Sequence, residues 1–312
     1  MDNSFQEIID QLSEEVSTKG TSLCIGTFDG VHRGHQKLFK ELVKISKINN
    51  LLSVVLVFEL RPREIINPSL SKPYIITIEE RIQNIKSQKV DKTIKINFGN
   101  NIRNISAKKF LEILKNKINL TSLVVSEDTK IGNDQKNGND LKKTCEELRI
   151  SFNSIKMSLD DNKIVSSSSV STHISNGEID KANSMLGRTF RISGKVETGD
   201  KIGRTIGIPT ANLSVSKNLI IPGDGIYAVK VKVNNQIYKG ALSIGNRPVI
   251  KEDDSRKIEV YIIDFNKNIY GELIEISIIS KIRNQENYDS LEELRFQIDK
   301  DIVQITNILE NA

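Results

Sequence analysis

The sequence predicts an α/β protein in two parts: a parallel sheet covered by helices, then a small antiparallel β-barrel with a terminal helix. Three observations support this prediction. The chain has 312 residues, which is typical of about two domains. Apolar runs alternate with helical periodicity in the first half, as expected of a parallel sheet. The second half changes to short strands separated by turns.

In the first half, the predicted strands and helices follow one another in chain order. Strands are expected at 22–25, 53–58, 93–97, 122–125 and 151–157, and helices at 36–49, 77–87, 106–117 and 141–148. The run 53–58 is rich in β-branched residues, as a strand buried on both faces should be. Ser106 is a suitable N-cap for the helix that follows it. Residues 166–169 form a serine patch, and Ser167–Ser169 are expected in a loop.

After a helix at 179–186, the second half is predicted to be a barrel. Strands are expected at 190–196, 225–233, 236–243, 257–265 and 273–279, and a last helix at 291–309. Asn234 and Asn235 suit a tight hairpin turn. Closing such strands into a barrel removes exposed edges. We therefore expect one domain over residues 1–186 and a second over residues 187–312.

Composition limits the classes of partner. The balance of 45 basic and 40 acidic residues gives a net charge of +5, with no basic block, so small anions are favoured over nucleic acid. Cys24 and Cys145 form no CxxC pair, which fits a reducing cytoplasm. We expect a soluble protein, because no segment looks like a secretory signal or a membrane span. The oligomeric state stays open.

The segment 23–35 combines a strand end, two glycines and two histidines. Gly26 and Gly30 permit unusual dihedral angles and close backbone approach. The turn leads into a helix N-terminus, where free N–H groups favour anions. His32 and His35 stand three residues apart and are expected on one helix face. Their imidazoles could donate to a triphosphate and stabilise charge that grows on its α-phosphate.

A second candidate site joins a glycine-rich segment to a strand acid. Residues 199–212 lack the ending of a Walker A loop. Thr210 and Asn212 alternate on an extended segment, so their oxygens share a face and suit Mg²⁺. Glu259 could accept a proton from a hydroxyl that attacks a γ-phosphate. A polar-tipped hairpin and a solvated strand acid are the alternative interpretations.

These motifs together resemble a known family. The form GxFDGxHxGH over residues 26–35 resembles that of bacterial bifunctional riboflavin kinase/FMN adenylyltransferases. So does the ordered succession GRTF, PTAN, GDGIY, SIGNRP, IEVYIIDF and YG from Gly187 to Gly271. The resemblance implies a Rossmann-like domain that transfers AMP from ATP to FMN. It also implies a six-stranded kinase barrel that uses ATP and Mg²⁺ to phosphorylate riboflavin.

The resemblance also implies roles for particular residues. It makes Glu259 the catalytic base of the kinase, His32 and His35 the catalytic pair of the transferase, and Thr210 and Asn212 the metal ligands. The residues that it implies at the substrates and cofactors are Gly26, Phe28, Asp29, Gly30, Gly34, Gly199, Gly203, Arg204, Gly207, Thr210, Asn212 and Arg283.

The first half departs from the family pattern at three places. Arg61 stands where the family has histidine, and Thr129 and Ile131 stand where it has aromatic residues. Ser171 stands where an arginine would clamp the ATP phosphates, and a serine hydroxyl cannot replace a guanidinium. Arg61 and Lys130 are candidates to supply the missing charge. Two alternatives therefore stay open: a monofunctional kinase with a scaffold-like first domain, and a non-enzymatic flavin or nucleotide sensor.

Overall fold

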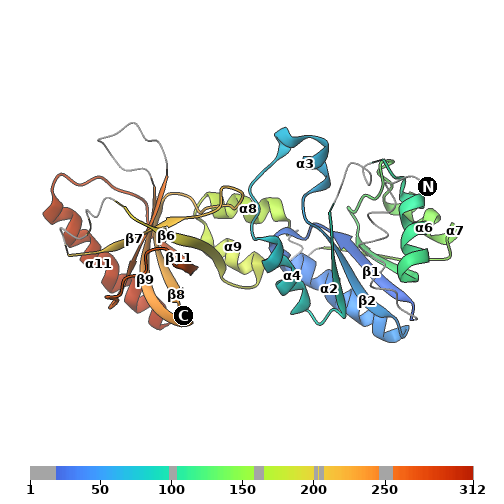
Figure 1. Cartoon of the computed structure of the whole chain (residues 1–312), viewed down its shortest axis with the longest axis horizontal. Coiled ribbons are helices and arrows are strands. Elements are labelled where there is room, and N and C mark those ends of the chain that lie inside the picture. The colour runs from blue at the N-terminus through green and yellow to red at the C-terminus, as the bar shows by residue number, and fades with distance from the viewer. Residues whose placement is uncertain are drawn as a thin grey trace. The chain divides into compact units, whose positions relative to one another are not determined.

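The computed structural model describes residues 19–97, 104–157, 165–199, 203, 207–245 and 256–311. The chain forms two compact units, Met1–Ser167 and Ser168–Ala312 (Figure 1). Helix α9 (Ile179–Leu186) packs on the barrel strands, and the Asn183 amide donates to the carbonyls of Ile278 and Ile279. This packing explains why the compact units divide earlier in the chain than residue 187.

The first unit contains the predicted parallel sheet. Its strand order is β3-β2-β1-β4-β5, with every pair parallel, as in a Rossmann-like fold. The strands are β1 (Thr21–Gly26), β2 (Leu52–Phe58), β3 (Lys92–Ile96), β4 (Leu120–Ser126) and β5 (Ser151–Ile155). The order reverses on the two sides of β1, and in open α/β sheets ligands bind at the carboxyl ends of the strands beside such a reversal.

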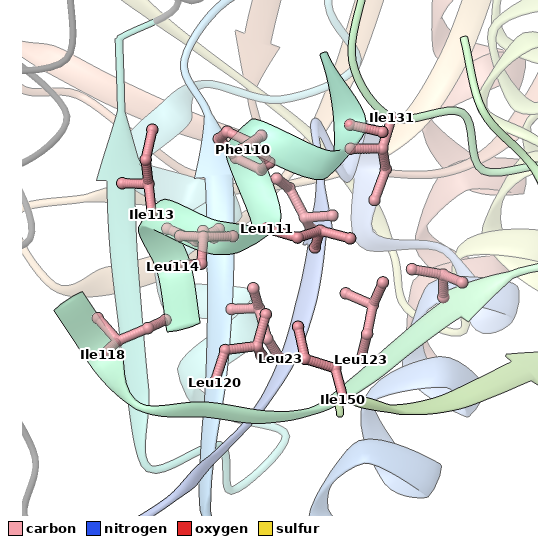
Figure 2. Packing of buried hydrophobic residues seen from close by; sticks show 14 of the residues in the cluster. Leu23, Phe110, Leu111, Ile113, Leu114, Ile118, Leu120, Leu123, Ile131 and Ile150 are labelled. Atoms are coloured by element: carbon pink, nitrogen blue, oxygen red, sulfur yellow. The ribbon is translucent and has the colours of Figure 1, made fainter. Parts of the chain in front are cut away.

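Helices connect these strands. They are the 3-10 turn η1 (Asp29–Val31), α2 (Arg33–Ile48), α3 (Pro62–Ile66), η2 (Pro68–Leu70), α4 (Ile78–Lys86), α6 (Ala107–Ile118) and α7 (Gly138–Glu147). Ser106 caps α6 as predicted, since its hydroxyl accepts from the Lys109 N–H at 3.3 Å. Leu111 and Leu114 of α6 pack with Leu23 and Leu123 of the sheet, and all four are fully buried (Figure 2).

The second unit contains a closed six-stranded barrel, as predicted. The strand order is β10-β7-β6-β11-β8-β9, with antiparallel neighbours throughout. The strands are β6 (Phe190–Glu197), β7 (Thr210–Ser214), β8 (Gly225–Val233), β9 (Gln236–Gly245), β10 (Lys257–Ile262) and β11 (Leu273–Arg283). Asn234 and Asn235 form the predicted hairpin turn, both with positive φ. Helix α11 (Leu291–Glu310) packs on β8, β9 and β11.

The prediction of a loop at the serine patch was wrong. Residues Ser167–Ser175 form helix α8, in which Val170 and Ile174 are fully buried. These two side chains stand one turn apart, so their burial stabilises a helix that serine propensity alone does not favour. Helix α3, with Pro62 in its first turn, was also not predicted. Among the described residues, no helix combines the length and apolar character needed to cross a membrane.

Leu111→Ala tests the packing of the parallel-sheet unit. We expect it to lower the free energy of unfolding of that unit by about 2–5 kcal/mol, because it leaves a cavity between α6 and the sheet. Asn116→Ala, at an exposed position of the same helix, is the matched control and should change it by less than about 0.5 kcal/mol. Calorimetry measures both variants, and equal transitions would contradict the packing described.

Candidate active sites

The turn between β1 and α2 has a strained backbone. Phe28, Gly30 and Val31 have φ values of 52°, 78° and 41°. Glycine adopts this region freely, whereas a side-chain-bearing residue such as Phe28 or Val31 adopts it at a cost of about 1–2 kcal/mol. His32 follows in an extended conformation and is the N-cap of α2. The turn therefore leads into the N-terminus of α2, and helix N-termini have free N–H groups that favour anions.

His32 and His35 lie together, although not both within the helix as expected. Their rings stack with centroids 3.7 Å apart, and the His35 backbone N–H donates to His32 Nδ1 at 3.4 Å. Burial lowers the pKa of the His35 imidazole well below its usual value, and His32 lowers it further. His35 Nδ1 is buried without a hydrogen-bond partner among the described residues. The pair is therefore built around a neutral imidazole at His35.

Two predicted glycines give these rings their space. A side chain at Gly26 would meet the Phe28 ring at 3.0 Å, and one at Gly34 would meet the His32 ring at 3.1 Å. The Phe28 ring in turn packs edge-on against His35, with centroids 5.3 Å apart. Glycine is needed at both positions because the Phe28 ring lies close to the backbone at Gly26 and the His32 ring lies close to the backbone at Gly34.

A cavity of about 640 Å³ opens beside His35 at the carboxyl ends of β1 and β4. Its lining includes these apolar and aromatic side chains: Ile25, Phe28, Leu38, Phe58, Pro62, Ile66, Ile105, Phe110 and Ile131. Polar residues at its border include Asn104, Ser126, Asp128, Lys130 and Gln135. A large apolar cavity with a few polar groups suits a flat heteroaromatic ligand. Phe58 and Phe110 supply aromatic surface that the sequence around Thr129 and Ile131 does not.

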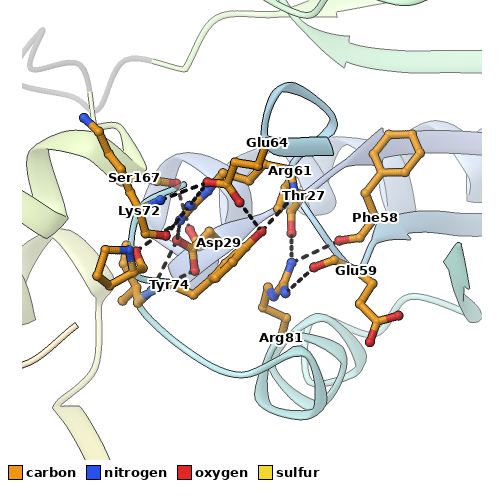
Figure 3. Close-up of polar contacts among 12 residues, drawn as sticks. Thr27, Asp29, Phe58, Glu59, Arg61, Glu64, Lys72, Tyr74, Arg81 and Ser167 are labelled. Atoms are coloured by element: carbon orange, nitrogen blue, oxygen red, sulfur yellow. Dashed lines mark hydrogen bonds and ion pairs between the residues drawn. The ribbon is translucent and has the colours of Figure 1, made fainter. Parts of the chain in front are cut away.

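A cluster of buried charges lies beside the turn (Figure 3). Arg61 makes ion pairs with Asp29 at 2.7 Å and with Glu64 at 2.5 Å. Its guanidinium carbon lies 3.9 Å from the centre of the Tyr74 ring, and the Tyr74 hydroxyl donates to Glu64 at 2.8 Å. Burial raises the pKa of the Asp29 carboxyl, and Arg61 opposes that rise only in part. The Asp29 carboxyl is fixed by its hydrogen bonds to Arg61 and to the backbone N–H of Ile75.

Arg81 fixes the same region from α4. Its guanidinium donates to the backbone carbonyls of Thr27 and Phe58 at 3.0 Å and of Glu59 at 2.8 Å (Figure 3). It therefore ties the end of β2 to the turn that follows β1. Sequence analysis missed this residue. The available signal was its position on the buried face of α4, three residues after Ile78 and four before Ile85.

In the barrel, strand register brings the predicted kinase residues to one face. Glu259 of β10 pairs directly with Asn212 of β7, and directly opposed side chains of antiparallel strands lie on the same face. Thr210 stands two residues before Asn212 and shares that face. The Thr210 hydroxyl lies 3.5 Å from Glu259 Oε2. The structure thus joins the three predicted side chains, although they are far apart in sequence.

The predicted glycines surround this face. A side chain at Gly199 would collide with the Asn212 carboxamide at 2.0 Å, and one at Gly203 would meet the Ile208 carbonyl at 2.2 Å. Gly207 has a φ of 77°, which glycine adopts without strain. Arg204 lies outside the described residues. The glycines therefore permit a close backbone cover over Thr210 and Asn212.

A second cavity, of about 470 Å³, lies beside Thr210. Its lining is Val196, Gly207, Pro209, Thr210, Ala211, Val260, Ile262, Phe265, Asn266, Lys267, Asn268, Ile269 and Tyr270. The cavity combines apolar strand residues with a polar loop and is next to the predicted metal ligand. A nucleotide could occupy it with its phosphates toward Thr210.

The structure gives Arg283 a structural partner. Its guanidinium donates to both carboxylate oxygens of Asp301 on α11, at 2.8–3.1 Å, and Gln297 donates to the same carboxylate at 2.9 Å. Asp301 is buried, so this pair fixes α11 to the end of β11. The predicted flavin contact of Arg283 stays a prediction.

Comparison with known proteins matches each half of the chain to a family. A family model described as FAD synthetase matches residues 14–169, and one described as riboflavin kinase matches residues 186–309. A bifunctional riboflavin kinase/FMN adenylyltransferase of Buchnera aphidicola is 38% identical, covering 90% of this chain and 92% of that protein. One of Haemophilus influenzae is 34% identical, covering 91% and 92%. This chain belongs to the bifunctional riboflavin kinase/FMN adenylyltransferase family.

A solved structure has a fold similar to that of this chain. A crystal structure described as a macrolide-efflux protein from Streptococcus pneumoniae matches with a TM-score of 0.83 at 28% identity. The match covers 95% of this chain and 97% of that one. Both parts of this family member therefore have a solved counterpart of nearly the same length.

The buried His35 imidazole predicts how stability depends on pH. Its folded-state pKa is depressed, so below about 6.5 the unfolded chain takes up a proton that the folded chain does not. Stability is then lost as pH falls from about 6.5 toward the folded pKa. Between pH about 7 and about 5.5, we expect the wild type to lose about 1 kcal/mol more than His35→Gln. Urea unfolding measures this difference, and parallel curves for the two proteins would contradict it.

Proposed function

We propose that this chain phosphorylates riboflavin to FMN in its barrel and transfers AMP from ATP to FMN in its parallel-sheet unit, giving FAD and pyrophosphate. One observation carries the proposal. A hydroxyl, a carboxamide and a carboxylate share one barrel face, and Thr210 of that face also lines a cavity. In the first unit, His35 of the stacked histidine pair lines another cavity beside the N-terminus of α2. Each reaction thus has its own set of residues.

For the kinase reaction, Glu259 is the proposed base. Its carboxylate would accept the proton of the ribityl 5′-hydroxyl as that oxygen bonds to the γ-phosphorus, and the bond from γ-phosphorus to ADP breaks. Thr210 and Asn212 fit Mg²⁺, because their neutral oxygens share a face that the backbone at Gly199 covers closely. Mg²⁺, when bound, would neutralise charge on the phosphates.

For the adenylyl transfer, the nucleophile is a phosphate oxygen of FMN, which is already an anion. It would attack the α-phosphorus of ATP as the bond to pyrophosphate breaks, so no proton needs to be removed. His32, His35 and the first N–H groups of α2 would stabilise the charge on the phosphates. The 640 Å³ cavity beside His35 would hold the isoalloxazine ring.

The two alternatives are not favoured. A sensor needs no carboxylate beside the Thr210 hydroxyl, and a degenerate scaffold needs neither stacked histidines nor an open cavity beside them. We keep residues 1–186 and 187–312 as the proposed division between the two activities. The cytoplasm stays the proposed compartment, because Cys24 and Cys145 are buried free thiols.

Glu259→Gln tests the kinase assignment. Incubation with riboflavin, ATP and Mg²⁺ and chromatography of the flavins should show FMN formation lowered by about 10²–10⁴-fold, because the base is lost. FAD formation from supplied FMN should persist. Glu275→Gln, on strand β11, which does not pair with β10, is the control and should make FMN normally. Normal FMN formation by Glu259→Gln would refute the role of base, and FMN without FAD in the wild type would refute the second activity.

Ser171→Arg tests the missing phosphate clamp. Ser171 lies on α8, where the family pattern has arginine, and an added guanidinium would supply a bidentate phosphate donor. We expect faster FAD formation from FMN and ATP, with FMN formation unchanged. Ser171→Met, which adds length without charge, is the control. Equal rates for the two variants would mean that charge at this position does not limit the reaction.

A further inference from the structure

The charge cluster beside the turn has no part in either proposed reaction. Arg61, Arg81, Asp29 and Glu64 bring two guanidinium groups and two carboxylates into one region. The side chains of Arg61, Asp29 and Glu64 are only 12%, 3% and 7% exposed. Burying charges is costly unless each is paired and hydrogen-bonded, and here Arg61 pairs with both Asp29 and Glu64.

The hydrogen bonds of Arg61 determine what it can bind. Its Nη1 donates to Glu64 Oε1 and to the Lys72 carbonyl, at 2.5 and 2.8 Å. Its Nη2 donates to Asp29 Oδ2 and to the Pro73 carbonyl, at 2.7 and 3.3 Å. The four terminal N–H bonds thus have acceptors within the protein. A phosphate could gain bonds to these atoms only by displacing a buried carboxylate or a carbonyl.

The carboxylate of Asp29 holds the strained turn in place. It accepts a hydrogen bond from Arg61 (Figure 3). It also accepts from the backbone N–H of Ile75, whose nitrogen lies 3.0 Å from Oδ1 and 3.2 Å from Oδ2. The Asp29 carbonyl accepts from the Ser167 hydroxyl at 2.8 Å. A backbone with positive φ at Phe28 and Val31 persists only where its surroundings hold it. Asp29 lies between these two residues and is the point of attachment.

Arg61 also connects the turn to the wall of the 640 Å³ cavity beside His35. It is the N-cap of α3, and Glu64 of α3 binds it. Pro62 and Ile66 of the same helix line the cavity, as does His35. One guanidinium therefore sets the position of α3 and of the histidine turn together.

We propose that Arg61 is a positioning residue for adenylyl transfer. It acts through Asp29, which holds the turn that carries His32 to the nucleotide, and it does not touch the phosphates. The proposal rests on the proposed transfer of AMP to FMN and adds to it how the histidine pair is held.

A double-mutant cycle tests the proposal. We expect Arg61→Met and Asp29→Asn each to lower kcat for FAD formation by on the order of tenfold to a hundredfold, with KM for ATP changed less than about threefold. The double variant should lose little more than either single variant, because both changes remove the same attachment. Losses that multiply, or a selective rise in KM for ATP, would show that Arg61 contacts the nucleotide itself and would overturn the proposal.

Matched variants separate this effect from simple loss of charge. Arg63→Met removes an exposed arginine of the same helix and should leave FAD formation unchanged. Arg61→Lys keeps the charge but loses the two-pronged geometry, so it should recover only part of the rate. Riboflavin phosphorylation by the same molecules should stay within about twofold of wild type. A full rate in Arg61→Lys would mean that charge alone suffices and would overturn the proposal.

Hydrogen-exchange mass spectrometry makes the test independent of activity. In Arg61→Met, amides of residues 26–35 should exchange faster, whereas Arg63→Met should match the wild type. If the wild type makes no FAD, the proposed function fails, and this measurement still decides on Arg61. Unchanged exchange in Arg61→Met would overturn the positioning role even if FAD is made.

Discussion

The attachment of a strained turn to a buried ion pair is the interaction on which the first site depends. Phe28 and Val31 adopt left-handed backbone angles, and together they cost about 2–4 kcal/mol. Asp29, between them, binds Arg61 and the backbone at Ile75. The strained residues lie in the turn that leads from the end of β1 to His32, the N-cap of α2. The geometry of the histidine pair therefore originates in contacts that lie outside the pair.

In the barrel, strand register, and not a strained turn, holds the candidate site residues in place. The pairing of Glu259 with Asn212 fixes which face of β7 and of β10 carries each side chain. A slip of one residue would move Thr210 and Asn212 to the opposite face together. Because the barrel is closed, no strand can shift without its neighbours. The positions of the proposed base and the proposed metal ligands are thus fixed by the same strand pairing that closes the barrel.

Periodicity and turn residues predicted both folds, because these are local properties of the chain. The roles of the site residues that the motifs suggest stay predictions. The β-branched run at 53–58 and the Asn234–Asn235 turn formed as expected. Helix α8 was missed because burial of Val170 and Ile174 decides it, and burial depends on tertiary packing. The role of Arg61 was missed for the same reason, since its acceptors are brought to it from distant parts of the sequence.

Charge balance explains why Arg61 is a poor substitute for a phosphate clamp. Asp29 and Glu64 offset the charges of Arg61 and Arg81, so the four groups add no net positive charge beside the turn. The depressed pKa of His35 keeps its imidazole neutral near pH 7. In the proposed function, attraction for a triphosphate would then come from hydrogen bonds of the histidine pair and of the N–H groups at the start of α2. A triphosphate at this site would therefore be held by hydrogen bonds from fixed positions more than by net charge.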